Sequence, residues 1–267
     1  MTLQDARATV GAATASTVPL LSLAEVSKVF NGELVALEGM ALDLFEGDFV
    51  SLLGPSGCGK STALRLIAGL SHPTSGRIAW GGGQCAGDLG VVFQEPTLMP
   101  WATVDHNVWL PWRLRGRGFA QMKDQVTEAL ALVGLEKFAR SYPRELSGGM
   151  KMRVSIARAL VTHPRLILMD EPFAALDEIT RHKLNTDLLE LRAKIGCTII
   201  FVTHSVFESV FLSSRVVVMA ARPGRVIREL AVDAPYPRGE EFRTSSEYAA
   251  HCRAASLALH DAIGENA

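Results

Sequence analysis

The chain has 267 residues and a mass of 28.8 kDa, with 48% hydrophobic and 21% charged residues. This composition is typical of a globular protein with a substantial core, and it excludes a mainly disordered chain, a collagen and a coiled coil. The 27 Lys and Arg nearly balance the 28 Asp and Glu. No global basic field therefore favours nucleic acid, and no nucleic-acid partner is expected.

Short apolar runs alternate with longer helical patterns along the chain, which indicates an α/β fold. Runs rich in Val, Ile and Leu are typical of strands that are buried on both faces of a parallel sheet. The predicted strands are Phe49–Leu53, Leu89–Phe93, Leu166–Met169, Thr198–Thr203 and Val216–Met219. The predicted helices begin near Ser61, span Gln121–Val133, follow Ser147, and span Thr180–Lys194 and Ser246–Ile263.

A segment rich in Trp and Pro, residues 95–118, interrupts this alternation and predicts the entry to a mainly helical insertion at about residues 96–160. Trp109 and Trp112 are three positions apart, so they share one helix face. They either pack in the core of the insertion or line a groove for a partner's helix. Trp101 belongs to the same argument with less support.

A glycine-rich loop, Gly54–Ser61, has the sequence G-P-S-G-C-G-K-S and stands between a predicted strand and a predicted helix. Glycines let backbone N–H groups approach phosphates closely, and the N-terminus of the next helix favours anions. Lys60 can reach the β- and γ-phosphates, and Ser61 can ligate Mg²⁺. The alternative is a glycine turn that binds nothing.

Two carboxylates follow a predicted strand in Leu166–Glu171, L-I-L-M-D-E. Ligands of open α/β sheets bind at the carboxyl ends of strands. We therefore expect Asp170 to bind Mg²⁺ through water and Glu171 to polarise an attacking water. The alternative is an acid pair that favours a helix N-terminus after Pro172.

A second motif, Leu146–Met150, has the sequence L-S-G-G-M and opens a helical pattern. It either forms a second anion-binding helix end, or Ser147 is an ordinary N-cap.

Taken together and in this order, the motifs resemble those of the ABC-transporter ATPase family over about residues 21–235. The resemblance implies a P-loop NTPase (RecA-like) core with a mainly parallel sheet, a helical subdomain and an N-terminal antiparallel β portion, with ATP and Mg²⁺ as ligands. Residues 1–20 would be a flexible extension and residues 236–267 a C-terminal helical tail.

The resemblance also implies roles for individual residues. Glu171, His204 and Gln94 would act in catalysis, and Ser61, Gln94 and Asp170 would hold the metal. The stretch Ala174–Asp177, A-A-L-D, resembles the family's D-loop. Nucleotide contacts would come from Phe30, Gly54, Pro55, Ser56, Gly57, Cys58, Gly59, Lys60, Ser61, Thr62, Ser147, Gly148, Gly149 and Asp177.

Two of the predicted site residues, His204 and Asp177, have alternative explanations. Two residues of the motifs, Met150 and Phe30, depart from the family pattern. His204 is otherwise a satisfied histidine at a strand end, and Asp177 a helix N-terminal acid. Met150 replaces a common glutamine, which we expect to alter detail rather than abolish activity. Phe30 in place of tyrosine loses a hydroxyl but keeps the stacking face.

The resemblance implies a head-to-tail homodimer with two ATP molecules at the interface, each contacted by Ser147 and Gly149 of the other copy. The expected partners are integral membrane permease subunits and, indirectly, a periplasmic or surface solute-binding protein. The expected location is the cytoplasmic face of a bacterial-type inner membrane, as a peripheral subunit.

Secondary motifs at 91–96, 98–101, 171–177 and 221–225 look like the nitrate/sulfonate/taurine importer branch. The alternatives are the ATPase of an exporter or a lipid-extraction system, a non-transport ABC ATPase, and a P-loop kinase. Fewer than 90 residues separate Lys60 from Ser147, which leaves no room for the coiled coils of repair ATPases. Only 63 residues follow His204, too few for an appended regulatory domain, so regulation by a bound small molecule is not expected.

The four cysteines form no C-x-x-C pair, which argues against a disulfide scaffold or a zinc ribbon and favours a reduced, cytosolic compartment. No apolar run reaches the about 18 residues that a membrane span needs. The first 20 residues lack the pattern of a signal peptide.

Overall fold

The computed structural model describes residues 18–83 and 88–264. Most of the predicted flexible extension (residues 1–20) lies outside the described residues, and so does Cys85. The cysteines inside these ranges, Cys58, Cys197 and Cys252, are free and buried.

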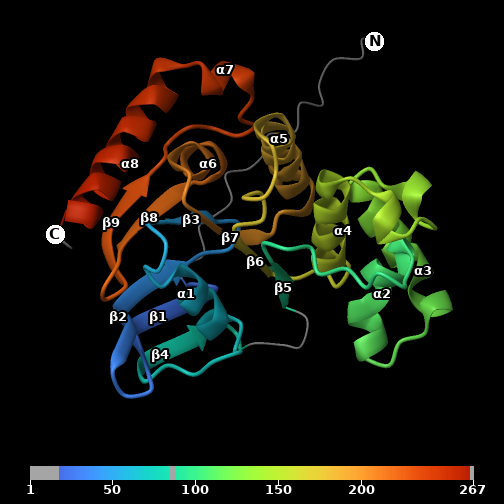
Figure 1. Cartoon of the computed structure of the whole chain (residues 1–267), viewed down its shortest axis with the longest axis horizontal. Coiled ribbons are helices and arrows are strands. Elements are labelled where there is room, and N and C mark those ends of the chain that lie inside the picture. Colours follow the sequence, from blue (N-terminus) through green and yellow to red (C-terminus); the bar gives the residue numbers. More distant parts are fainter. Residues whose placement is uncertain (1–17, 84–87, 265–267) are drawn as a thin grey trace, which may run out of the picture.

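A six-stranded sheet forms the centre of the molecule, with the strand order β5-β6-β7-β3-β8-β9 (Figure 1). The neighbouring pairs from β5 to β8 are parallel, and β9 pairs antiparallel with β8 at the edge. The prediction of a mainly parallel sheet is thus confirmed. The strands are β3 (Phe49–Leu53), β5 (Leu89–Val92), β6 (Leu166–Asp170), β7 (Thr198–Thr203), β8 (Arg215–Ala220) and β9 (Arg225–Ala231).

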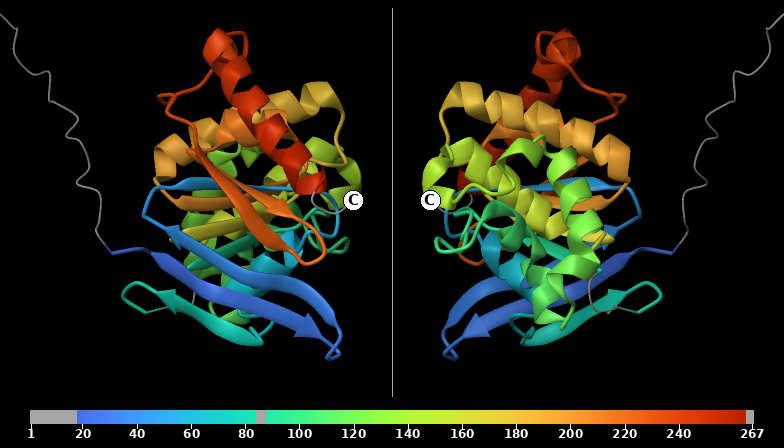
Figure 2. Two further views of the ribbon diagram at one scale, coloured as in Figure 1. Left: turned by 90° about the vertical axis from the view of Figure 1, so that its left-hand side faces the viewer. Right: turned by 90° about the vertical axis from the view of Figure 1, so that its right-hand side faces the viewer.

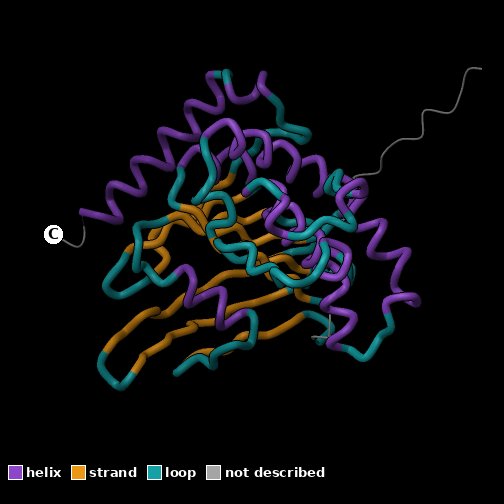
Figure 3. Tube along the Cα trace, turned by 45° about the vertical axis from the view of Figure 1, so that its right-hand side comes forward, coloured by secondary structure: helices purple, strands orange, loops and turns teal. Residues whose placement is uncertain are grey.

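A second, three-stranded antiparallel sheet lies below the first and confirms the N-terminal antiparallel portion. It consists of β1 (Leu21–Phe30), β2 (Leu34–Leu44) and β4 (Ser75–Trp80). Helix α1 (Lys60–Ile67) runs between the two sheets (Figure 3). Its buried side chains join those of both sheets in one apolar cluster, because each sheet turns one apolar face inward.

Helices cover the opposite face of the six-stranded sheet (Figure 2). They are α5 (Glu178–Ile195), α6 (Val206–Leu212), α7 (Glu240–Arg243) and α8 (Ser246–Gly264). Ala255, Ala258 and Ala262 of α8 are fully buried in the same apolar cluster as Phe49 and Phe201 of the sheet. Small side chains let α8 lie close against its neighbours, so this C-terminal helix belongs to the core packing.

A compact group of helices stands beside the sheet and has an apolar cluster of its own. It contains α2 (Val104–Leu114), α3 (Phe119–Leu132), α4 (Gly148–Leu160) and the short 3₁₀ helices Glu136–Phe138 and Pro143–Glu145. Trp109 and Trp112 pack against this cluster, and their indole N–H groups donate to Arg117 O and Val161 O, each at 3.1 Å. Their role is therefore internal packing, whereas Trp101 is 76% exposed.

The buried guanidinium of Arg238 ties the C-terminal segment to the helical face of the sheet. Arg238 is 3% exposed and donates hydrogen bonds of 2.8–3.3 Å to five carbonyl oxygens. These carbonyls belong to Val210, Phe211, Ser213, Val232 and Ala234. Burial lowers the pKa of Arg238, but the carbonyls hold its N–H groups in place of water.

We predict that Arg238→Ala lowers the free energy of unfolding by about 3 kcal/mol or more, because several buried carbonyls lose their only cationic donor. Urea unfolding followed by circular dichroism measures this change. Arg228→Ala on the exposed face of β9 is the matched control and is expected to change stability by less than about 0.5 kcal/mol. Equal effects of the two substitutions would contradict the role of Arg238.

Candidate nucleotide-binding site

The predicted site residues gather at the carboxyl ends of three neighbouring strands, β6, β7 and β3. The glycine-rich loop follows β3, Asp170 ends β6, and His204 follows β7. Because these strands are parallel, their carboxyl ends meet at one edge of the sheet. Segments that are far apart in the sequence therefore form one site.

The glycine-rich loop needs glycine at specific positions. Gly57 and Gly59 have φ values of +80° and +89°, a region that residues with a Cβ rarely adopt. At Gly54 a Cβ would lie 2.6 Å from Met219 O, and at Gly59 it would lie 2.6 Å from Ala36 O. The loop is therefore clamped between β2 and the end of β8.

Lys60 folds back onto this loop. Its side chain is 4% exposed, and Nζ donates to Gly54 O at 2.8 Å and to Pro55 O at 3.0 Å. Nζ also lies 4.0 Å from Glu171 Oε1. Burial raises the pKa of the adjacent Cys58 thiol, and the charge of Lys60 opposes this effect.

Ser61 and Asp170 face each other across the site. Ser61 Oγ donates to Asp170 Oδ1 at 3.1 Å. Burial raises the pKa of Asp170, and the neighbouring charge of Glu171 adds to this effect, while the Ser61 hydrogen bond opposes it. The carboxylate is thus held in a place where its charge lacks full compensation.

Glu171 lies between the lysine and the histidine. Its φ of +46° is unusual for a residue with a side chain, and its N–H donates to Val202 O at 3.1 Å, which holds the strained turn. Glu171 Oε2 lies 3.3 Å from His204 Nδ1. The structure therefore brings together the three predicted groups Lys60, Glu171 and His204.

One open pocket of about 1030 Å³ contains most of the predicted residues. From the predicted set it is lined by Phe30, Ser56, Gly57, Gly59, Lys60, Ser61, Thr62, Gln94, Asp170 and Glu171. Further lining residues that the sequence analysis missed are Glu33, Leu34, Val35, Ala36, Glu38, Arg222 and Pro223.

The missed residue of most interest is Arg222, an exposed cation with a φ of +56° on the turn between β8 and β9. Gly224 of this turn packs against Ala36 O and Cys58 O, where a Cβ would approach to 2.5 Å. The segment A-R-P-G-R was visible in the sequence, but only the fold places it against the phosphate loop.

The structure does not bring every predicted residue into this pocket. Ser147 is the N-cap of α4 and accepts from Met150 N at 3.3 Å; Gly148 and Gly149 begin the same helix. Asp177 is the N-cap of α5, and the Thr180 N–H that it accepts lowers the pKa of its carboxyl. None of these four residues lines the pocket, and Ser147 and Asp177 are exposed.

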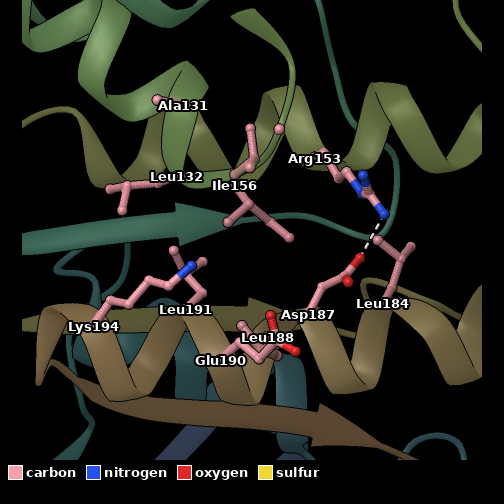
Figure 4. Close-up of a pocket in the computed structure, with 12 residues that line it drawn as sticks. Ala131, Leu132, Arg153, Ile156, Leu184, Asp187, Leu188, Glu190, Leu191 and Lys194 are labelled. Atoms are coloured by element: carbon pink, nitrogen blue, oxygen red, sulfur yellow. Dashed lines mark hydrogen bonds and ion pairs between the residues drawn. The ribbon is translucent and has the colours of Figure 1, made fainter.

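A separate hollow of about 250 Å³ lies where α3 and α4 meet α5 (Figure 4). Apolar side chains such as Leu132, Ile156 and Leu188 line it, and Arg153 Nη2 donates to Asp187 Oδ2 at 2.5 Å. The helical group thus contacts the core through apolar side chains and one ion pair that spans from α4 to α5.

The fold and the pocket define a P-loop ATPase of the α/β class. A family model described as ABC transporter matches residues 37–174. An uncharacterised ABC transporter ATP-binding protein of Methanocaldococcus jannaschii is 47% identical over 85% of this chain and 86% of its own length. The chain therefore belongs to the ABC transporter family, as an ATP-binding subunit that hydrolyses ATP.

Two further relatives carry transport functions in their names. The nitrate import ATP-binding protein of Synechocystis is 45% identical, with 80% of this chain and 83% of the relative covered. The aliphatic sulfonates import ATP-binding protein of Bacillus cereus is 42% identical, with coverage of 85% and 92%.

Solved structures agree with the fold. A dimeric, post-hydrolysis ATP-binding cassette bound to ADP and Pi is 34% identical, with a TM-score of 0.68 over 80% of this chain and 100% of its own. A cassette from Clostridium perfringens, part of the cbiONQ transporter complex, has a TM-score of 0.74 at 27% identity over 92% and 99%. Cassettes of this family bind ATP or ADP, form dimers and work with transporter subunits.

We predict that Asp170→Asn raises the melting temperature of the nucleotide-free chain at pH 7. The raised pKa means that the ionised carboxylate disfavours the folded state above that pKa, and this cost disappears as the pH falls through it. The gain in melting temperature should therefore be full at pH 7 and shrink as the pH is lowered towards the ordinary range of an aspartate carboxyl, in a fluorescence-monitored melt. The same variant should lose the stabilisation that ATP with Mg²⁺ gives.

Asp177→Asn is the control with the opposite sign. The pKa of Asp177 is lowered, so its charge stabilises the folded state at neutral pH and this contribution is lost as the pH falls through the lowered value. This variant should melt at a lower temperature at pH 7. A lower melting temperature for both variants would contradict the account of Asp170.

Proposed function

We propose that this chain is the ATPase subunit of an importer that takes up a small anionic or zwitterionic solute of the nitrate, sulfonate or taurine kind. The observation that carries the proposal is its 45% and 42% identity to nitrate and aliphatic sulfonate import ATP-binding proteins over most of each chain. No helix within residues 18–83 and 88–264 is long and apolar enough to cross a membrane. The chain would act at the cytoplasmic face, as a peripheral subunit.

In the proposed mechanism, Lys60 exchanges the carbonyls of its own loop for the β- and γ-phosphates of ATP. Backbone N–H groups of Gly57 to Lys60 and the N-terminus of α1 add positive potential at the same place. The base of ATP would stack on Phe30, which is 36% exposed in the pocket wall.

The residues around Asp170 fit a Mg²⁺ ion. Ser61 supplies a hydroxyl, Asp170 a carboxylate and Gln94 an amide, all at one pocket, and these hard oxygen ligands are the kind that Mg²⁺ takes. The raised pKa of Asp170 supports this assignment, because a cation would compensate its charge. When bound, Mg²⁺ neutralises charge on the β- and γ-phosphates.

Glu171 would act as the general base for the attacking water. Its carboxylate lies between Lys60 Nζ at 4.0 Å and His204 Nδ1 at 3.3 Å, beside the lysine that would bind the γ-phosphate. His204 would hold the γ-phosphate and orient Glu171, and Gln94 would sense the γ-phosphate from the start of the helical group.

Each ATP site would be completed by a second copy of the chain. Ser147, Gly148, Gly149 and Asp177 do not line the pocket of their own chain, although the N-terminus of α4, which starts after Ser147, suits phosphate binding. A head-to-tail homodimer would place them over the partner's nucleotide, in agreement with the dimeric relative that holds ADP and Pi.

A groove next to Gln94 would receive the permease. It has a volume of about 350 Å³ and lies between β5 and the helices α2 and α4. Phe93, Leu110, Pro111 and Leu114 make it apolar, and Arg115 and Arg158 lie at its border. Such a groove suits an amphipathic helix, and its position connects ATP binding to the membrane partner.

We predict that Glu171→Gln keeps ATP binding and loses hydrolysis by a factor of at least about 10³, because the general base is gone. The variant should accumulate as an ATP-bound dimer and, from membranes solubilised in mild detergent with ATP and Mg²⁺, should co-purify with a multi-span membrane protein. Recovery of soluble dimer alone, while a known transporter stays intact, would count against the transport function.

The solute class is tested by growth. A strain lacking this chain should fail on one nitrogen or sulfur source among nitrate, taurine and alkanesulfonates, and the wild-type gene should restore growth while Glu171→Gln should not. Normal growth of the deletion strain on every one of these sources would reject the importer branch and leave the family assignment untouched.

A further inference from the structure

A polar pocket of about 510 Å³ lies on the helical face of the molecule, between α5, the start of α6 and the α7–α8 segment. Its lining includes two arginines, Arg181 and Arg243, and two glutamates, Glu178 and Glu208, together with Asn185. The remaining lining residues are His182, Ser205, Phe207 and Tyr248. It shares no lining residue with the nucleotide pocket.

The side chains of this pocket carry buried polar atoms without hydrogen-bond partners. Within the described ranges six buried side-chain polar atoms lack such a partner, and five belong to this pocket: Arg181 Nε, Asn185 Oδ1, Glu208 Oε1, and Nε and Nη2 of Arg243. Asn185 is 1% exposed, Glu208 8%, and the Arg243 side chain 9%.

Nearby opposite charges do not satisfy these atoms. Arg181 Nε is 3.9 Å from Glu208 Oε1, and Arg243 Nε is 3.4 Å from Glu240 Oε1, outside hydrogen-bonding geometry. A buried polar group without a partner destabilises the folded state, so a cluster of them calls for an explanation. The volume is within the range of small-molecule sites.

The chemistry of these atoms defines what would satisfy them. The Arg243 guanidinium lies 3.4 Å above the Phe211 ring, so the N–H groups in its plane stay available to an anionic oxygen. Asn185 Oδ1 and Glu208 Oε1 accept hydrogen bonds, so they suit a donor such as an ammonium group. Arginines and glutamates line the same pocket, which favours a ligand that carries both an anionic and a cationic group.

We propose that this pocket binds a small zwitterion, a molecule with an ammonium group and a carboxylate or sulfonate. Its anionic oxygens would accept from Arg181 and Arg243, and its ammonium would donate to Asn185 and Glu208. The hollow in Figure 4 differs from this pocket. There Arg153 and Asp187 point toward each other and form an ion pair, so their charges require no ligand.

Two residues of this pocket, Arg181 and Glu208, also have polar atoms that hydrogen-bond to segments with predicted site residues. Arg181 Nη2 donates to Leu176 O at 2.9 Å and to Ala174 O at 3.4 Å, which fixes the stretch before Asp177. Glu208 Oε2 accepts from Thr203 Oγ1 at 2.6 Å, directly before His204. A ligand that binds Arg181 and Glu208 is therefore expected to change kcat for ATP hydrolysis.

Calorimetric titration of the full-length, nucleotide-free chain tests the site, with β-alanine and taurine as zwitterionic probes and acetate and ethylammonium as single-charge probes. We expect saturable binding of a zwitterion and weaker binding of both single-charge probes. Arg243→Met and Asn185→Leu should each weaken binding at least about tenfold, the loss of one good hydrogen bond in a buried site. Arg228→Met on exposed β9 is the matched control and should bind normally.

Asn185→Leu also distinguishes loss of binding from loss of folding, because it removes an unpaired buried oxygen and should keep or raise the melting temperature. Absence of binding in the millimolar range, equal binding of the single-charge probes, or binding that neither variant weakens would overturn the site. Binding without a change in kcat would overturn its link to hydrolysis. None of these measurements involves a membrane partner, so they stand apart from the importer proposal.

Discussion

The side-by-side parallel pairing of β6, β7 and β3 is the constraint on which the rest of the site depends. Each strand is followed by a different functional segment: the acid pair, the histidine and the glycine-rich loop. Parallel pairing in register brings Asp170 level with Val202 and Leu53 level with Thr203, so all three segments leave the sheet at one edge. A change of strand order would separate Glu171 from both His204 and Lys60, whatever their local sequences. The helices on one face and the antiparallel sheet on the other keep these strands buried, as a parallel sheet requires.

Several groups of the site are held in conformations or surroundings that lower the stability of the folded chain. Lys60 is almost fully buried and donates to two carbonyls of its own loop, Asp170 has a raised pKa, and Glu171 adopts a left-handed backbone conformation. Strained or undercompensated groups of this kind cluster at functional sites because the surrounding structure holds them. In the proposed function a phosphate group would compensate the charge of Lys60 and a divalent cation that of Asp170, so ligand binding would stabilise the folded chain.

The sequence predicted those parts of the fold that local patterns determine. The buried strands and the glycine-rich loop carry continuous apolar runs and a specific spacing, and the structure has them within one or two residues of the predicted bounds. Strand β9 was missed because half of its residues are charged or exposed, as expected of an edge strand. Arg222 and the α5–α6–α8 pocket were missed for another reason: their residues come from segments that only the tertiary fold places together. The alternatives for Trp109 and Trp112 were separated by the packing of both rings against the helical cluster and by the hydrogen bonds of their indole groups.

Helix α5 links the segment around Asp177 to the helical group and to the C-terminal segment. Its N-cap is Asp177. Within the helix, Arg181 donates to Leu176 O before Asp177, and Asp187 accepts from Arg153 of α4. Near its C-terminal end Arg192 donates to Gly47 O and lies 4.2 Å from the ring of Tyr236 in the C-terminal segment. A continuous helix moves as one body, because each turn is bonded to the next. In the proposed dimer, a displacement of Asp177 by the second copy would therefore be transmitted to the helical group and to the C-terminal segment. The same helix supplies Arg181 and Asn185 to the polar pocket, so a ligand there would act on the element whose N-cap is Asp177.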